Sequence, residues 1–70
     1  MNKEFVTLTG IDKTVNIKRS SVVKITVEKT QNLEKPYMVD IKTSDKKFDS
    51  YLMFRSKEEA DSEVEKFFNP

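Results

Sequence analysis

Apolar and polar residues alternate through most of the first 54 residues, and this period of two limits the chain to a β-rich fold. The segments EFVTLTG, KTVNIK, VVKITVEKT, PYMVDIKT and KFDSYLMF carry apolar side chains at alternate positions. Successive side chains of a strand point to opposite faces of a sheet, so the alternation is typical of half-buried strands. It predicts strands over residues about 4–10, 13–18, 22–30, 36–43 and 47–54.

The period becomes helical in the last segment, RSKEEADSEVEKFF. Ser56, followed three residues later by Glu59, matches a capping box. At about 100° per residue, the apolar side chains of this segment share one face, which predicts a helix over about 56–68 that ends before Pro70. The acidic side chains flank that face, and some lie in the first turn, where the helix dipole favours negative charge. We therefore expect a solvated face, with no metal, at Glu58, Glu59, Asp61, Glu63 and Glu65.

Short polar connections between the strands indicate one antiparallel meander. The sequence predicts a single α+β domain over residues 1–70, with a strongly bent, barrel-like five-stranded sheet and one C-terminal α-helix packed on it. The face expected toward the helix carries Val6, Leu8, Val15, Ile17, Val23, Ile25, Val27, Val39, Ile41, Phe48, Leu52 and Phe54, with Tyr37 also buried. The opposite face keeps Phe5, Val22, Met38, Tyr51 and Met53.

Absent residue types exclude several kinds of catalytic site. The chain has no cysteine and no histidine, so disulfides, thiolate ligands and an imidazole base are excluded. Its single glycine, Gly10, cannot form a glycine-rich phosphate loop. Asp40 and Asp49, on facing strands, are the remaining pair for acid–base chemistry, and we interpret them as solvent-side acids. We expect neither an enzyme nor a bound cofactor or metal.

The apolar groups on the uncovered face favour a role in protein binding, because one helix covers only one face of a sheet. We predict partner-binding residues at Phe5, Met38, Tyr51 and Met53. The partner would be another protein or a second copy, so the protein would act as a homo-oligomeric adaptor or inhibitor. The alternative is a weak single-stranded nucleic-acid binder that uses the basic strand residues Lys18, Arg19 and Lys24.

The order of VTLTG, VNIKRSSVVKI, VDIKTSDKKF and RSKEEADSEVEKFF resembles the FlbD-type flagellar proteins and similar small proteins of bacteria and phages. The resemblance covers Val6 to Phe68 and implies the architecture alone, with no functional residue. The connection KTQNLEKPY is longer than that pattern has, and a small phage protein that binds a host factor fits equally well. The start of the sequence lacks the apolar stretch of a secretory signal, and no apolar run would span a bilayer. We expect a cytoplasmic protein without membrane contact.

Overall fold

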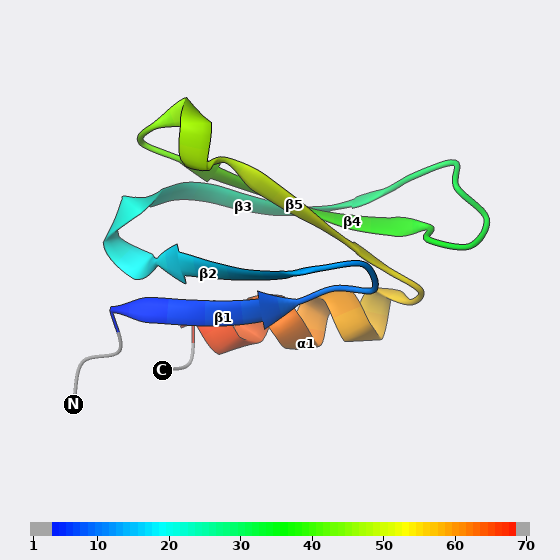
Figure 1. The fold of residues 1–70 in the computed structure, drawn as a ribbon. Coiled ribbons are helices and arrows are strands. Elements are labelled where there is room, and N and C mark those ends of the chain that lie inside the picture. The colour runs from blue at the N-terminus through cyan, green and yellow to red at the C-terminus, as the bar shows by residue number, and fades with distance from the viewer. Residues whose placement is uncertain (1–3, 69–70) are drawn as a thin grey trace.

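The computed structural model describes residues 4–68, which form an α+β arrangement of five strands and one α-helix (Figure 1). The predicted domain limits and the helix end at Pro70 extend beyond these residues. The predicted strands and helix are all present, and only the fifth strand starts more than one residue from its expected position. The elements are β1 (Phe5–Thr9), β2 (Thr14–Lys18), β3 (Val22–Lys29), β4 (Tyr37–Thr43), β5 (Ser50–Phe54) and α1 (Lys57–Phe68), with short 3-10 helices η1 (Arg19–Ser21) and η2 (Lys46–Phe48).

The strands form two antiparallel sheets, so the prediction of a single five-stranded, barrel-like meander is wrong. β1 pairs with β2 in one sheet, and the other has the order β3-β4-β5. The connection between β2 and β3 contains η1, and it carries the chain from one sheet to the other without a ladder between them. Figure 1 shows the β1–β2 hairpin lying below the three-stranded sheet.

The core lies between the two sheets and is closed on one side by α1. The helix runs alongside β1 (Figure 1) and also contacts β3, β4 and β5. Its start is set by Ser56, whose hydroxyl oxygen accepts a hydrogen bond from the Glu59 N–H at 3.2 Å, which confirms the N-cap half of the predicted capping box. The buried apolar residues are Val6, Leu8, Ile17, Val39, Ile41, Leu52, Phe54 and Ala60.

A β-bulge at the start of β3 reverses the predicted orientation of two valines. The pairing of β3 with β4 shifts between Val22 and Lys24, which leaves Val23 as the extra residue. Val22 therefore packs against the core, and Val23 is 71% exposed. The sequence predicted the opposite for both.

Phe48 was also predicted in the core, and the structure places it in η2 with 62% of its surface exposed. The Asp45 side chain accepts a hydrogen bond from the Lys47 N–H at 3.2 Å, and the Phe48 N–H bonds to the Asp45 carbonyl at 2.9 Å. These local bonds favour a turn over a strand. Phe68, predicted on the apolar face of the helix, is likewise exposed.

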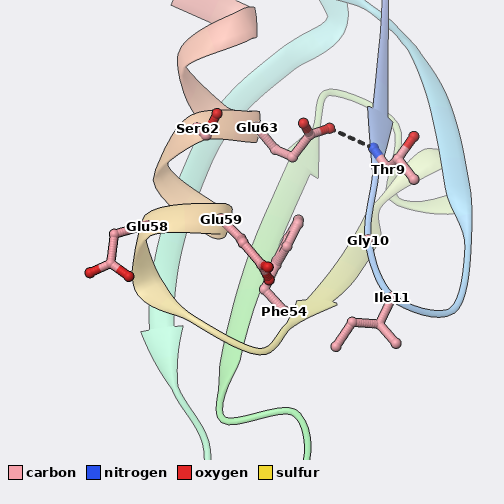
Figure 2. A pocket seen from close by; sticks show the side chains of 8 residues that line it. All are labelled: Thr9, Gly10, Ile11, Phe54, Glu58, Glu59, Ser62 and Glu63. Carbon is pink, nitrogen blue, oxygen red and sulfur yellow. Dashed lines mark hydrogen bonds between the residues drawn. The ribbon is translucent and has the colours of Figure 1, made fainter.

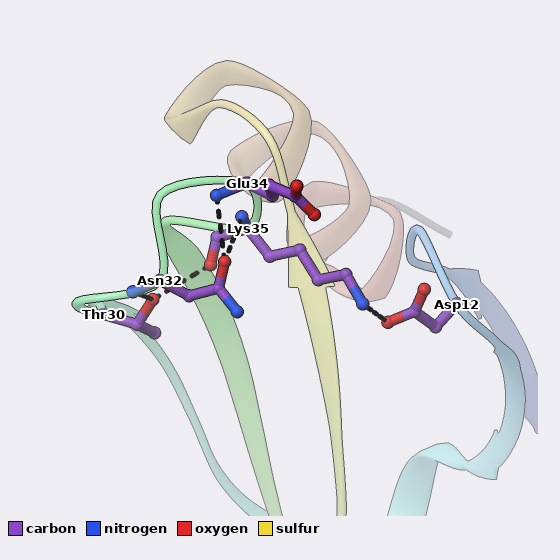
Figure 3. Close-up of polar contacts among 5 residues, drawn as sticks. All are labelled: Asp12, Thr30, Asn32, Glu34 and Lys35. Atoms are coloured by element: carbon purple, nitrogen blue, oxygen red, sulfur yellow. Dashed lines mark hydrogen bonds and ion pairs between the residues drawn. The ribbon is translucent and has the colours of Figure 1, made fainter.

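The long connection between β3 and β4 is ordered by side chains that bond to its backbone (Figure 3). The Asn32 amide oxygen accepts hydrogen bonds from the Glu34 and Lys35 N–H groups at 2.9 and 3.0 Å. The Thr30 hydroxyl donates to the Lys35 carbonyl at 2.9 Å. Lys35 also forms an ion pair with Asp12 in the β1–β2 turn, which links the connections of the two sheets.

Candidate functional site

A cleft of about 500 Å³ opens between β2 and the start of β5. One wall is formed by β2, and η2 and Ser50 form the other. Its exposed surface is mostly apolar, and two of the apolar side chains that line it, Phe5 and Phe48, are 56% and 62% exposed. The cleft is lined by Phe5, Val15, Asn16, Ile17, Lys18, Ser21, Thr43, Lys47, Phe48 and Ser50.

The β2 wall of the cleft is an unpaired strand edge. The Arg19 N–H bonds to the Glu4 carbonyl, and the Gly10 N–H bonds to the Lys13 carbonyl at 2.8 Å, across the β1–β2 ladder. Hydrogen-bonded and non-bonded pairs alternate along an antiparallel ladder. The backbone groups of Asn16 therefore point away from β1, and within residues 4–68 no hydrogen bond uses them.

The outer edge of β5 is closed at one end and open at the other. The Ile11 N–H, in the β1–β2 turn, donates a hydrogen bond of 2.9 Å to the Met53 carbonyl oxygen. Met53 therefore directs its backbone groups away from β4, and by the same alternation Tyr51 does too. Toward its start at Ser50, β5 diverges from β2, as Figure 1 shows. Ser50 and residues of β2 line the cleft.

Two lysines give the cleft a positive charge. Lys18 and Lys47 both line it, and their intramolecular ion pairs are long, at 3.5 Å to Glu4 and 3.7 Å to Asp45. Exposed pairs of this kind contribute little to stability and exchange readily with water. Both ammonium groups are therefore available to an anionic ligand in the cleft.

The structure brings three of the four predicted partner-binding residues together and separates the fourth. Met38 of β4 lies directly opposite Met53 of β5, and Tyr51 lies beside them opposite Asp40. These side chains are on the outer face of the three-stranded sheet, where the Lys13 ammonium sits 4.2 Å from the centre of the Tyr51 ring. Phe5 belongs to the other sheet and lines the cleft.

The three cations of the nucleic-acid alternative lie on different parts of the molecule. Lys18 lines the cleft, and Lys24 is exposed on the outer face of β3. The Arg19 guanidinium donates a hydrogen bond to the Phe67 carbonyl and lies 5.0 Å from the Phe67 ring centre. Arg19 therefore binds the C-terminal end of α1, where a cation is favoured, and nucleic-acid binding stays a prediction.

Glu63 does not lie on a solvated helix face as predicted. Its Oε1 accepts a hydrogen bond of 2.8 Å from the Thr9 N–H (Figure 2). Its carboxylate also pairs with Lys66 at 2.6 Å, and its side chain is only 15% exposed. Thr9 directs its N–H away from β2, so the carboxylate satisfies the free edge of β1.

Glu63 also lines a second cavity of about 420 Å³, together with Glu58 and Glu59 at the start of the helix (Figure 2). Within residues 4–68, no group of three or more acidic side chains is arranged to hold a metal ion.

Asp40 and Asp49 have different partners. Asp49 accepts hydrogen bonds from the Thr43 N–H at 2.7 Å and the Thr43 hydroxyl at 3.0 Å. The backbone bond is the largest cause that lowers the pKa of Asp49, whereas a carboxyl group that exchanges protons near neutral pH needs a raised pKa. Asp40 forms an ion pair with Lys42 at 3.6 Å.

The alternating pattern did not identify the cleft, because Lys47 and Phe48 were assigned to a strand, with Phe48 in the core. The part of the chain that the structure describes has no helix both long and apolar enough to cross a membrane.

Comparison with protein-family models, with curated proteins and with solved structures gave no match to this chain.

Proposed function

We propose that this protein is a non-enzymatic protein-interaction module, an adaptor or inhibitor that binds an extended acidic segment of another protein in the cleft between β2 and β5. The observation that carries the proposal is that the cleft runs along the outer edge of β2, where the backbone groups of Asn16 are unpaired, and reaches the first residue of β5, next to the outward-directed backbone groups of Tyr51. Such edges recruit an added strand, because main-chain hydrogen bonds supply affinity without requiring a particular sequence.

The side chains around these edges define the partner. In an extended segment, alternate side chains point to opposite sides. Apolar side chains on one side would contact Val15, Ile17 and Phe48, and acidic side chains on the other would reach Lys18 and Lys47. The partner segment is therefore expected to alternate small apolar residues with Asp or Glu.

The outer face of the three-stranded sheet supports binding less well than the cleft does. Met38 and Met53 are already half-buried, and the Lys13 ammonium lies over the Tyr51 ring. We expect this face to add contacts to a partner that is first held in the cleft. Replacing both Tyr51 and Met53 with serine should then weaken binding less than a change in the cleft does.

The proposal is tested by adding a peptide of alternating Glu and Val residues to the isotope-labelled full chain and following its amide resonances. The resonances of Asn16 and Ser50, which line the cleft, should shift in a saturable way. A peptide of alternating Lys and Val should leave them unchanged, because its charge matches that of the cleft.

Matched variants locate the binding site on the molecule. Reversing both cleft charges, with Lys18→Glu and Lys47→Glu, should weaken binding by about tenfold or more, because paired charges become repulsive. Lys24→Glu on the outer face of β3 is the control and should bind as the unmodified protein does. Shifts confined to the outer face, or equal binding of the two peptides, would refute the cleft as the binding site.

A further inference from the structure

The outer edge of β3 is also unpaired, and it lies on the side of the three-stranded sheet opposite β5. β3 ends the order β3-β4-β5, and the Thr30 N–H bonds to the Pro36 carbonyl at 2.6 Å at the end of its ladder with β4. Because hydrogen-bonded and non-bonded pairs alternate along the β3–β4 ladder, the backbone groups of Ile25 and Val27 point away from β4. Across the described residues, no hydrogen bond uses them.

The charged side chains along this edge are complementary to those of a second copy of β3 that runs antiparallel to it. Lys24 and Glu28 are exposed and lie two residues before and two residues after Thr26, on the same face of β3. Neither forms an ion pair with another described residue. Opposite charges that are placed symmetrically about one residue match when the strand pairs antiparallel with a copy of itself.

We propose that two copies of the chain form a dimer by antiparallel pairing of their β3 strands, with the two-fold axis at Thr26. Lys24 of each copy then lies opposite Glu28 of the partner subunit, and the two Thr26 side chains face each other. Ile25 pairs with Val27 of the partner subunit, so the outward backbone groups of both residues find their hydrogen-bond partners. Opposite charges and threonine pairs are both favourable across neighbouring strands.

Neighbouring registers lose these matches. A two-fold axis at Val27 would place Ile25 opposite Lys29 of the partner subunit and would separate both charge pairs. An axis at Lys24 would place two lysines opposite each other, which is unfavourable. The charges therefore select the register that is centred on Thr26.

The dimer would join two three-stranded sheets into one continuous sheet, with the Met38, Tyr51 and Met53 faces of both copies on the same side. Both clefts would stay open, because no residue of β3 lines them. Two clefts in one particle would bind a partner with two acidic segments more tightly through effective concentration. This last step rests on the proposed function, whereas the dimer does not.

Sedimentation equilibrium of the full chain and its charge variants tests the dimer. The unmodified chain should dimerise in a concentration-dependent way. Lys24→Glu and Glu28→Lys, each alone, should weaken dimerisation by about tenfold or more, because every charge pair becomes repulsive. The double variant should restore it, and so should an equimolar mixture of the two single variants, which would form a mixed dimer.

Circular dichroism of each single variant should match that of the unmodified chain, since both side chains are exposed. A monomeric unmodified chain at about 1 mM, or a double variant as weak as the single ones, would overturn the proposed dimer. Binding of the peptide of alternating Glu and Val tests the cleft independently of the dimer. A monomeric Lys24→Glu variant that still binds the peptide supports the proposed function, and a dimer that does not bind it refutes only that function.

Discussion

The Ile11 N–H donates a hydrogen bond of 2.9 Å to the Met53 carbonyl oxygen, and this bond joins the β1–β2 turn to the free edge of β5. It fixes the point at which the two sheets meet and from which the cleft widens. The close approach depends on Gly10, because a Cβ atom at that position would lie 3.0 Å from the Leu52 Cβ and 3.0 Å from the Met53 carbonyl oxygen.

Gly10→Ala should therefore destabilise the protein by about 1–3 kcal/mol, the usual cost of forcing an extra methyl group into a packed contact. Urea unfolding followed by circular dichroism measures this change. Gln31→Ala, at an exposed position of the β3–β4 connection, is the control and should change stability by less than about 0.5 kcal/mol. An unchanged stability in Gly10→Ala would mean that the turn does not need this close contact with β5.

The contact between Glu63 and Thr9 gives a second prediction. Glu63→Ala should lower the free energy of unfolding by about 0.5–1.5 kcal/mol, because the exposed Thr9 N–H exchanges its charged acceptor for water. Glu63→Gln keeps an acceptor oxygen at the same place, so its free energy of unfolding should fall clearly less. Hydrogen exchange of the Thr9 amide should accelerate in the alanine variant alone, and equal acceleration in both variants would contradict this role.

The bulge in β3 gives a third prediction, on two valines of the three-stranded sheet. Val39 is fully buried, so Val39→Ala should cost about 2–3 kcal/mol through lost burial and the cavity that remains. Val23 is 71% exposed, so Val23→Ala should change stability by less than about 0.5 kcal/mol. Denaturant unfolding of both variants compares them directly, and a similar large loss in both would place Val23 in the core, as its sequence pattern suggests.

These valines show what the sequence could and could not predict. Alternation identified the strands and Ser56 identified the helix start, because both signals depend on neighbouring residues alone. A bulge adds one residue to a strand without interrupting its apolar run, so the pattern assigned Val23 to the face that Val22 occupies.

The sequence pattern also did not predict the cleft or the division of the strands into two sheets. The short connection that contains η1 reads like a hairpin turn, and only the tertiary structure shows that β2 and β3 do not pair. Of the predicted partner-binding residues, Phe5 lines the cleft, but its neighbour there, Phe48, was assigned to the core. The position of Phe48 depends on hydrogen bonds that the Asp45 and Asp49 carboxylates accept from backbone N–H groups, which a period-two pattern does not report.

The turn that positions Phe48 gives the last prediction, a dependence of stability on pH. The Thr43 N–H, which bonds to the Asp49 carboxylate, holds the pKa of Asp49 below its ordinary value of 3.8 in the folded state. A lowered folded-state pKa stabilises the protein fully at pH values above the unfolded-state pKa. This contribution is lost as the pH falls from near 3.8 through the lower folded-state value.

Asp49→Asn removes this titration, so its stability should fall less steeply than that of the unmodified chain as the pH drops below about 4. Urea midpoints measured across that range give the comparison. Thr43→Val removes the hydroxyl donor and keeps the backbone donor, which is the larger cause of the shift, so it should retain most of the pH dependence. If Asp49→Asn and the unmodified chain lost stability in parallel, the carboxylate would not be stabilising the turn that carries Phe48 into the cleft.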